Sequence, residues 1–179
     1  MSLSINNKLN ITLCGMMGSG KTAIGKSLAN KINYKFFDSD KLIEKKAKKS
    51  IKDIFNEDGE LFFRNLEEQV IINLLYEKNI IISLGGGSLA NKNIRKLIKK
   101  NSYNIYLQVK IDILVKRLKN SKSRPLIINK DLNIILNELM EKRIKFYQKA
   151  DLIIDNQNSL NESVKKIINN IYYEKKNKY

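Results

Sequence analysis

A glycine-rich segment that ends in lysine and threonine constrains this chain more than any other part of its sequence. Residues Gly15 to Thr22 read Gly-Met-Met-Gly-Ser-Gly-Lys-Thr and follow the short apolar run 9–14. Backbone N–H groups in such a loop, continued by the start of a helix, form a concave site for polyphosphate. In this pattern the lysine reaches the β- and γ-phosphates and the hydroxyl binds Mg²⁺. The segment predicts a strand, a loop and a helix that bind a nucleoside triphosphate; the alternative is a glycine-rich turn without a ligand.

Length and composition fit a single domain with a substantial core. The chain has 179 residues, of which 42% are hydrophobic. No apolar run is long enough to span a bilayer, and residues 1–8 lack the apolar stretch of a signal peptide. Cys14 is the only cysteine, so an internal disulfide is impossible. We therefore expect a cytoplasmic protein without a membrane partner, and a buried, unreactive Cys14 thiol.

The chain is strongly basic. It has 34 Lys and Arg residues against 18 Asp and Glu residues, a formal net charge of +16. Such a charge could attract nucleic acid or acidic membranes. The lysines are spread along predicted helix faces, as in 45–49 and 92–100, and no compact cluster of basic and aromatic residues stands out. This distribution favours solvated helix faces and a general attraction of anionic substrates over specific binding of nucleic acid.

Strand and helix patterns alternate along the chain. Apolar runs typical of buried parallel strands lie at 9–14, 34–37, 80–84, 105–109 and 152–154, with helical patterns between them. This order predicts an α/β fold whose parallel sheet has helices on both faces and binds ligands beyond the carboxyl ends of its strands. Residues 41–59 and 120–130 interrupt the alternation. We interpret the first as a substrate-binding insertion and the second as a lid.

Two carboxylates end the second apolar run. Asp38 and Asp40 are two positions apart, which would put both on the same side of an extended chain. Beyond the carboxyl edge of the sheet they would face the phosphate loop. One could hold Mg²⁺ through water while the other accepts a proton from a substrate hydroxyl. Helix N-capping by either residue is the alternative.

Three consecutive glycines, 85–87, follow the third apolar run. Glycine is used where a backbone must come close to a ligand or take a positive φ. The run also fits a flexible turn, so its place at the same predicted edge as the phosphate loop is what makes it a candidate for the site.

Arg64 stands near the start of the predicted helix 63–76, with Glu67 and Glu68 three and four positions further on. At this spacing a glutamate can hold the guanidinium in one orientation. A fixed guanidinium suits bidentate binding of a substrate carboxylate. An ordinary surface ion pair is equally consistent with these residues.

Taken together, the motifs resemble those of shikimate kinases, a phosphate-loop family similar to nucleoside-monophosphate kinases. The shared motifs are Gly15 to Thr22, Asp38-Ser39-Asp40, Gly59-Glu60 with Phe63-Arg64, Gly85-Gly86-Gly87, Arg124-Pro125-Leu126, and Arg143 with Tyr147. The resemblance implies a three-layer fold with a five-stranded parallel sheet, in one kinase domain over 1–179, with the insertion at 41–63 and the lid at 120–130. It implies transfer of the ATP γ-phosphoryl group to the 3-hydroxyl of shikimate, a step in aromatic amino acid biosynthesis.

The resemblance also implies a role for each matching residue. ATP would be bound by Gly18, Ser19, Gly20, Lys21, Thr22, Ala23, Arg117 and Arg124, with Arg117 against the adenine. Mg²⁺ would be bound by Thr22 and, through water, by Asp38. Shikimate would be bound by Asp40, Arg64, Gly86, Arg143, Phe55 and Phe63, with both arginines on its carboxylate. The catalytic residues would be Asp40 as the base, together with Lys21 and Arg124.

One departure from the family pattern affects Arg143. Shikimate kinases commonly have proline two positions after this arginine, where the present chain has Lys145.

The chain also has no histidine, so the proton acceptor must be a carboxylate or solvent.

Two other functions remain open from the residues. A kinase for another small molecule, such as gluconate or a nucleotide, would share the phosphate loop. A nucleic-acid-stimulated ATPase would fit the basic charge, but the third apolar run ends in glycine rather than in the acidic pair usual for such enzymes. We expect a monomer without a specific nucleic-acid partner.

Overall fold

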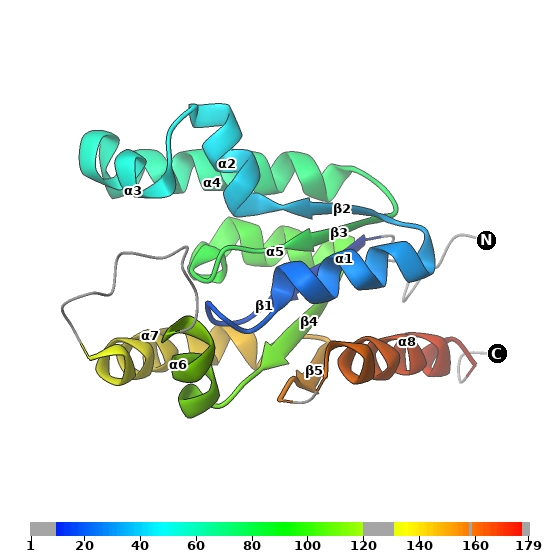
Figure 1. Cartoon of the computed structure of the whole chain (residues 1–179). Coiled ribbons are helices and arrows are strands. Elements are labelled where there is room, and N and C mark those ends of the chain that lie inside the picture. Colours follow the sequence, from blue (N-terminus) through cyan, green and yellow to red (C-terminus); the bar gives the residue numbers. More distant parts are fainter. Residues whose placement is uncertain (1–9, 120–130, 158, 177–179) are drawn as a thin grey trace.

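The chain forms a five-stranded parallel sheet with helices on both faces (Figure 1). The structure is a computed structural model that describes residues 10–119, 131–157 and 159–176. Its strands are β1 (Asn10–Cys14), β2 (Lys35–Asp38), β3 (Ile80–Ser83), β4 (Ser102–Gln108) and β5 (Leu152–Asp155). They lie in the order β2-β3-β1-β4-β5, and every neighbouring pair is parallel. The predicted fold class is confirmed, and all five carboxyl ends lie at one edge.

The helices fill the connections between the strands. They are α1 (Lys21–Ile32), α2 (Ser39–Ala47), α3 (Ile51–Asp53), the π-helix η1 (Ile54–Asp58), α4 (Gly59–Tyr76), the 3₁₀-helix η2 (Ser88–Ala90), α5 (Lys92–Asn101), α6 (Ile111–Lys119), α7 (Leu132–Tyr147) and α8 (Leu160–Lys176). The segment predicted as an insertion is thus helical, from α2 through α3 and η1 to the first turn of α4. In Figure 1 this group extends beyond the sheet at the upper left.

Two apolar clusters cover the two faces of the sheet. Ile11 and Leu13 of β1 pack in one cluster with side chains of α1 and α8. Cys14, at the end of the same strand, belongs to the other cluster, with side chains of α4, α5, α6 and α7. A strand buried on both faces needs this arrangement, because successive side chains point to opposite sides. The central strands are therefore fixed from both sides, and so is the edge from which the phosphate loop leaves.

The predicted start of the fourth strand, at residue 105, was wrong. β4 begins at Ser102, and its first residues are polar but buried. Thr12 Oγ1 lies 3.1 Å from Ser102 Oγ and donates to Asn104 Oδ1 at 3.0 Å. Because these side chains bind one another, they can lie inside the sheet without an apolar pattern.

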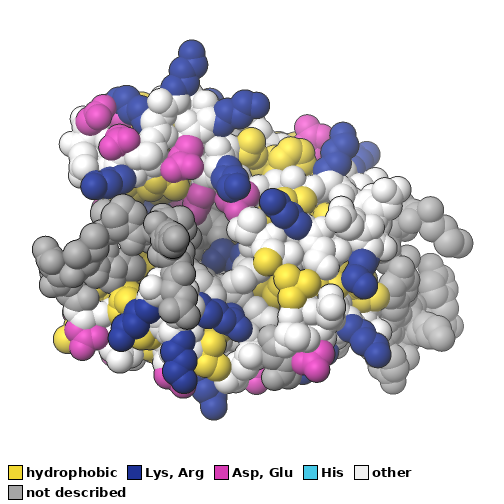
Figure 2. Space-filling view, in the orientation of Figure 1, with side chains coloured by type: hydrophobic (Ala, Val, Ile, Leu, Met, Phe, Trp, Pro, Cys, Tyr) yellow, Lys and Arg dark blue, Asp and Glu magenta, His cyan; other side chains and the backbone are white. Residues whose placement is uncertain are grey.

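The Lys and Arg side chains of the described residues are spread over the face drawn in Figure 2. They are separated by acidic, apolar and uncharged ones. Within the ranges that the structure describes, no helix is both long and apolar enough to cross a membrane.

Candidate active site

The loop between β1 and α1 has the geometry of an anion site. Three of its glycines, within 15–20, have φ between +78° and +141°, a region that other residues rarely adopt. Lys21 is the first residue of α1, and its Nζ donates to the carbonyl oxygens of Gly15 at 2.9 Å and Met16 at 3.0 Å. The lysine therefore lies along the loop. The start of an α-helix directs its first N–H groups outward, so the start of α1 suits an anion.

The two predicted magnesium ligands lie in contact. Thr22 Oγ1 donates to Asp38 Oδ2 at 2.7 Å. Asp38 also caps α2, with the Lys41 N–H 3.5 Å from Oδ1, so the capping alternative holds for this residue. A hydroxyl that donates keeps its lone pairs, and hydroxyl and carboxylate oxygens suit Mg²⁺.

Substrate phosphates and water would have to complete the coordination of such an ion. Among the described residues, no group of three or more His, Cys, Asp or Glu side chains could hold a metal by itself. Mg²⁺ is usually bound in this way, through one or two protein oxygens together with phosphates and several waters. The donor set of Thr22 and Asp38 therefore fits the ion.

Asp40 does not lie on an extended chain, and the prediction that it shares one side of a strand with Asp38 was wrong. β2 ends at Asp38 and α2 begins at Ser39, which places Asp40 in the first helical turn. The cause is the cap at Asp38, which turns the chain into α2. Ser39 is buried and accepts a hydrogen bond of 2.9 Å from the Gly85 N–H. This bond fastens the start of α2 to the glycine turn.

Each glycine of the turn 85–87 has a polar side chain as its nearest neighbour. The atom nearest to a Cβ built at each position is, in order, Asp40 Oδ1 at 2.6 Å, Arg143 Nη1 at 3.0 Å and Arg64 Nη1 at 3.1 Å. None of these glycines has a positive φ. The glycines therefore do not serve a positive φ, and these side chains take the space that a Cβ would fill. Close approach of the turn to a ligand stays a prediction. The turn gathers a carboxylate and two guanidinium groups from α2, α7 and α4.

Arg64 is held by two carboxylates of its own helix. Nη1 donates to Glu67 Oε2 at 2.8 Å, while Nε and Nη2 donate to Glu60 Oε1 at 3.2 Å. Glu67 is only 1% exposed, and its other oxygen accepts from the Ser88 hydroxyl at 2.7 Å. Burial alone would lower the pKa of Arg64, but the two carboxylates outweigh it and the pKa is raised. The predicted Arg64–Glu67 pair is confirmed, and the guanidinium stays charged.

Arg143 lies in an unbroken helix. α7 continues through Lys145, the position where the family pattern has proline, and ends at Tyr147. The Tyr147 hydroxyl donates to the Gly86 carbonyl oxygen at 2.5 Å, and its ring stacks on Tyr106 with 5.0 Å between centroids. Burial raises the pKa of Tyr147, while Arg143 acts in the opposite direction. Arg143 thus lies beside the glycine turn and interacts with the tyrosine that binds it.

Phe55 and Phe63 form an aromatic pair beside Arg64. Their ring centroids are 4.7 Å apart, and the Arg64 guanidinium carbon lies 5.1 Å from the centre of the Phe63 ring. Phe63 is buried, whereas Phe55 is 38% exposed and lies in the π-helix η1. π-Helices are rare and frequently occur at functional sites.

Asn156, a residue that the sequence analysis missed, lies against both the phosphate loop and Arg117. Arg117 donates to the Gly18 carbonyl at 3.4 Å and to the Asn156 carbonyl at 3.1 Å, so it lies against the phosphate loop. The Asn156 side chain binds the loop directly, at the Ser19 carbonyl. Its only sequence signal was its position just after β5, at the carboxyl edge. Arg124 and the predicted lid 120–130 lie outside the described residues.

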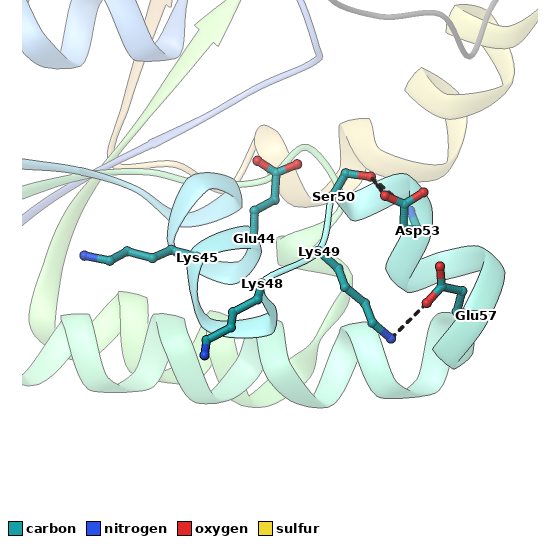
Figure 3. A pocket seen from close by; sticks show the side chains of 7 residues that line it. All are labelled: Glu44, Lys45, Lys48, Lys49, Ser50, Asp53 and Glu57. Carbon is teal, nitrogen blue, oxygen red and sulfur yellow. Dashed lines mark hydrogen bonds and ion pairs between the residues drawn. The ribbon is translucent and has the colours of Figure 1, made fainter.

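A separate open cleft of about 540 Å³ lies between α2, α3 and η1 (Figure 3). Its lining residues are Glu44, Lys45, Lys48, Lys49, Ser50, Asp53 and Glu57. Lys49 pairs with Glu57 at 3.0 Å, and Ser50 donates to Asp53 at 2.6 Å. The cleft contains none of the predicted site residues, and several of its polar groups bind one another.

Cys14 ends β1 immediately before the loop. Its thiol is buried, and burial raises its pKa to about 12. Only the thiolate is a good nucleophile, so a thiol that stays protonated is unreactive. The predicted burial of Cys14 is confirmed.

Comparison with known proteins identifies the arrangement. Residues 17–172 match the family model described as shikimate kinase. A shikimate kinase from Bartonella quintana is 38% identical over 169 residues, which cover 94% of this chain and 79% of that protein. The structure of a shikimate kinase from Acinetobacter baumannii in complex with shikimate is 32% identical, with a TM-score of 0.88 over 94% of this chain and 95% of that one. A gluconokinase from Sinorhizobium meliloti, 16% identical with a TM-score of 0.64 over 96% of this chain and 97% of that one, shares the fold alone.

Proposed function

We propose that the phosphate loop and the glycine turn 85–87 form the active site of this chain. The chain belongs to the shikimate kinase family. The chain is an ATP-dependent kinase that transfers phosphate to shikimate, in aromatic amino acid biosynthesis. One observation carries the assignment of the site: the side chains of Asp40, Arg143 and Arg64 are the nearest neighbours of the three glycines in turn.

The nucleotide half of the proposed site is the loop and the start of α1. Residues Gly18 to Ala23 present backbone N–H groups to the phosphates, and Lys21 adds a positive charge. The contacts of Lys21 with the loop carbonyls support this, because its ammonium already lies along the loop. Arg117, bound to the Gly18 carbonyl, lies against the adenine.

The acceptor half is the glycine turn with its three polar side chains. Arg64 and Arg143 bind the carboxylate of shikimate, and Phe55 and Phe63 form an apolar wall beside Arg64. Asp40 orients the acceptor hydroxyl and accepts its proton, because the chain has no histidine that could do so. Positioning and neutralisation of charge account for most of the catalysis in phosphoryl transfer, and these residues supply both.

Mg²⁺ is the cation that we assign to Thr22 and Asp38. The 2.7 Å contact between them supports this, because it gathers a hydroxyl and a carboxylate beside the first turn of α1. When bound, Mg²⁺ supplies positive charge that neutralises the phosphate oxygens during transfer.

The substrate assignment is tested by measuring ADP release with each acceptor supplied singly. We expect turnover with shikimate and only background release with gluconate, AMP or single-stranded DNA. Faster release with gluconate or AMP would assign the chain to another acceptor. ADP release stimulated by DNA would favour the alternative of a nucleic-acid-stimulated ATPase. Lys21→Ala, run in parallel, controls for contaminating kinases.

We further propose that the protein is a cytoplasmic monomer with small-molecule substrates and no specific partner among nucleic acids or membranes. The single buried cysteine supports a reducing compartment, since it requires no oxidative step. Light scattering coupled to size-exclusion chromatography, with and without substrates, measures the mass and would reveal a dimer at twice 20.8 kDa.

A further inference from the structure

We propose that Asn156 is a positioning residue that holds the phosphate loop and Arg117 in the arrangement that binds nucleotide. The residue follows β5 directly and is 4% exposed. The inference rests on the proposed function only in taking the loop 15–22 as the nucleotide site, and it makes no use of the acceptor.

Asn156 binds four different segments at once. Its side-chain Nδ2 donates to the Ser19 carbonyl at 2.6 Å, and its Oδ1 accepts from the Ser163 hydroxyl of α8, also at 2.6 Å. Its backbone carbonyl accepts from Arg117 Nη2 at 3.1 Å, and its N–H donates to the Gln108 carbonyl at 2.8 Å. The phosphate loop, α6, α8 and the end of β4 therefore meet at one residue.

The hydrogen bond from Asn156 to the Ser19 carbonyl also fixes the N–H of the next residue. In a planar trans peptide the C=O and the following N–H point in opposite directions. Holding the Ser19 carbonyl therefore also fixes the direction of the Gly20 N–H. The amide packs closely as well, because a Cβ at Gly20 would lie 3.2 Å from Asn156 Nδ2.

The start of α1 depends on this contact because it lacks a capping side chain. Gly20 is the N-cap of α1, has φ +89°, and makes no side-chain cap bond. Glycine is also the residue that restrains its backbone least. Since the N–H groups at this helix end are the expected donors to phosphate, an outside contact that holds Gly20 also holds the donors.

The neighbours of Asn156 set the orientation of its amide. Ser163 is 1% exposed and donates to Oδ1, which leaves Nδ2 facing the Ser19 carbonyl. An asparagine can do this because it has an acceptor and a donor side by side. An aspartate at this position would bring an acceptor against the Ser19 carbonyl and could not replace the bond.

The variants that test this role are Asn156→Ala, Asn156→Asp and Ser163→Ala. Asn10→Ala is the matched control. Asn10 is also a buried asparagine, 2% exposed, and donates to the Glu77 carbonyl at 2.6 Å. It begins β1, at the edge of the sheet opposite to the loop. For each variant the measurements are the Kd of ATP with Mg²⁺ in the absence of acceptor, the Kd of shikimate, and the free energy of unfolding in urea.

We expect Asn156→Ala to raise the Kd of ATP about 3- to 10-fold, the effect of one or two net hydrogen bonds. Asn156→Asp raises it at least as much, and Ser163→Ala about 2-fold, since the amide remains but loses its orienting partner. The Kd of shikimate should stay unchanged in all of them. Asn10→Ala should lower the free energy of unfolding by a similar amount while leaving the Kd of ATP unchanged.

An unchanged Kd of ATP in folded Asn156→Ala would overturn the proposal. So would an equal rise in Asn10→Ala, because the effect would then be general destabilisation. If Asn156→Ala does not fold, Ser163→Ala decides, and an unchanged Kd of ATP in that variant overturns the role. Failure of the wild-type chain to bind or phosphorylate shikimate would instead contradict the proposed function, since none of the ATP measurements involves the acceptor.

Discussion

The hydroxyl of Thr22 and the carboxylate of Asp38 are joined by a hydrogen bond of 2.7 Å. The bond links the start of α1, which follows β1, to the end of β2. These strands are not neighbours, because β3 lies between them in the sheet. The contact therefore spans the carboxyl edge above the strand that leads into the glycine turn. It places both proposed metal ligands at this edge, where α1 begins directly after the phosphate loop.

The first prediction concerns Mg²⁺. Thr22→Val keeps the shape of the side chain but removes the oxygen, and Asp38→Asn removes the negative charge. We expect each to raise the Mg²⁺ concentration for half-maximal activity about 10-fold or more, the range for ligands and their direct partners. Titration of the initial rate with Mg²⁺ measures this, with Thr22→Ser as the control that keeps the hydroxyl. A Thr22→Val enzyme with the wild-type Mg²⁺ dependence would remove Thr22 from the metal site.

The second prediction concerns the transfer step. Lys21→Ala and Asp40→Asn should each lower kcat by about 10² or more, because each removes one well-placed charge from the reacting groups. Lys26→Ala and Asp112→Asn change the same residue types at exposed positions and should leave kcat unchanged. Circular dichroism verifies that all four variants fold. A near-native kcat in either of the first two would show that the chemistry has been assigned to the wrong residue.

The parts of the fold that follow from apolar pattern could be predicted from the sequence. β1 and β3 are continuous buried runs that lead into glycine-containing turns, and their position and type were right. The start of β4 could not be predicted, because Ser102 and Asn104 are polar. Their burial depends on hydrogen bonds to Thr12 and, for Ser102, also to the Ile98 carbonyl. Bonds between residues about 90 positions apart leave no local pattern.

In the candidate site, too, only the residues of local motifs could be placed from the sequence. The phosphate loop and Arg64 with Glu67 are local motifs, so their geometry follows from spacing along one loop or one helix. The placement of Asp40 needed knowledge that Asp38 would cap α2. Asn156 makes its contacts with residues from four other segments, and no spacing in the sequence brings them together.

The third prediction concerns pH. Burial raises the pKa of Cys14 from 9.0 to about 12, so the folded thiol keeps its proton where the unfolded one loses it. The contribution of the protonated Cys14 thiol to the free energy of unfolding is therefore complete below pH 9. It is lost as the pH rises from about 9 to about 12. At pH 8 the folded chain carries about 10³-fold less thiolate than the unfolded chain. We expect iodoacetamide to label the protein in urea and to leave the native protein nearly unlabelled; rapid native labelling would contradict the burial.

The fourth prediction concerns the glycine turn. Gly87 has φ −101°, so alanine can adopt its backbone conformation without strain. Its Cβ would nevertheless lie 3.1 Å from Arg64 Nη1 and 3.2 Å from Nη2, which forces the guanidinium to move. We expect Gly87→Ala to raise the KM for shikimate about 10-fold or more, the loss of roughly one hydrogen bond to a charged group. The Kd of ATP serves as the internal control. Equal weakening of both ligands would indicate a general distortion rather than displacement of Arg64.

The fifth prediction concerns the acceptor carboxylate. Arg64→Lys keeps the positive charge but loses the rigid, two-pronged donor, so it is not a conservative change. We expect acceptor binding to weaken by about 1.5–3 kcal/mol, the range for hydrogen bonds to charged groups, with the Kd of ATP nearly unchanged. Glu67→Gln should weaken shikimate binding in the same direction, because the buried carboxylate holds Arg64 at 2.8 Å. Glu60→Gln is the matched control, since its side chain is 67% exposed and its pair with Arg64 is longer, at 3.2 Å. Calorimetric titration with shikimate measures all three, and an Arg64→Lys protein that binds shikimate as tightly as the wild type would show that the carboxylate lies elsewhere.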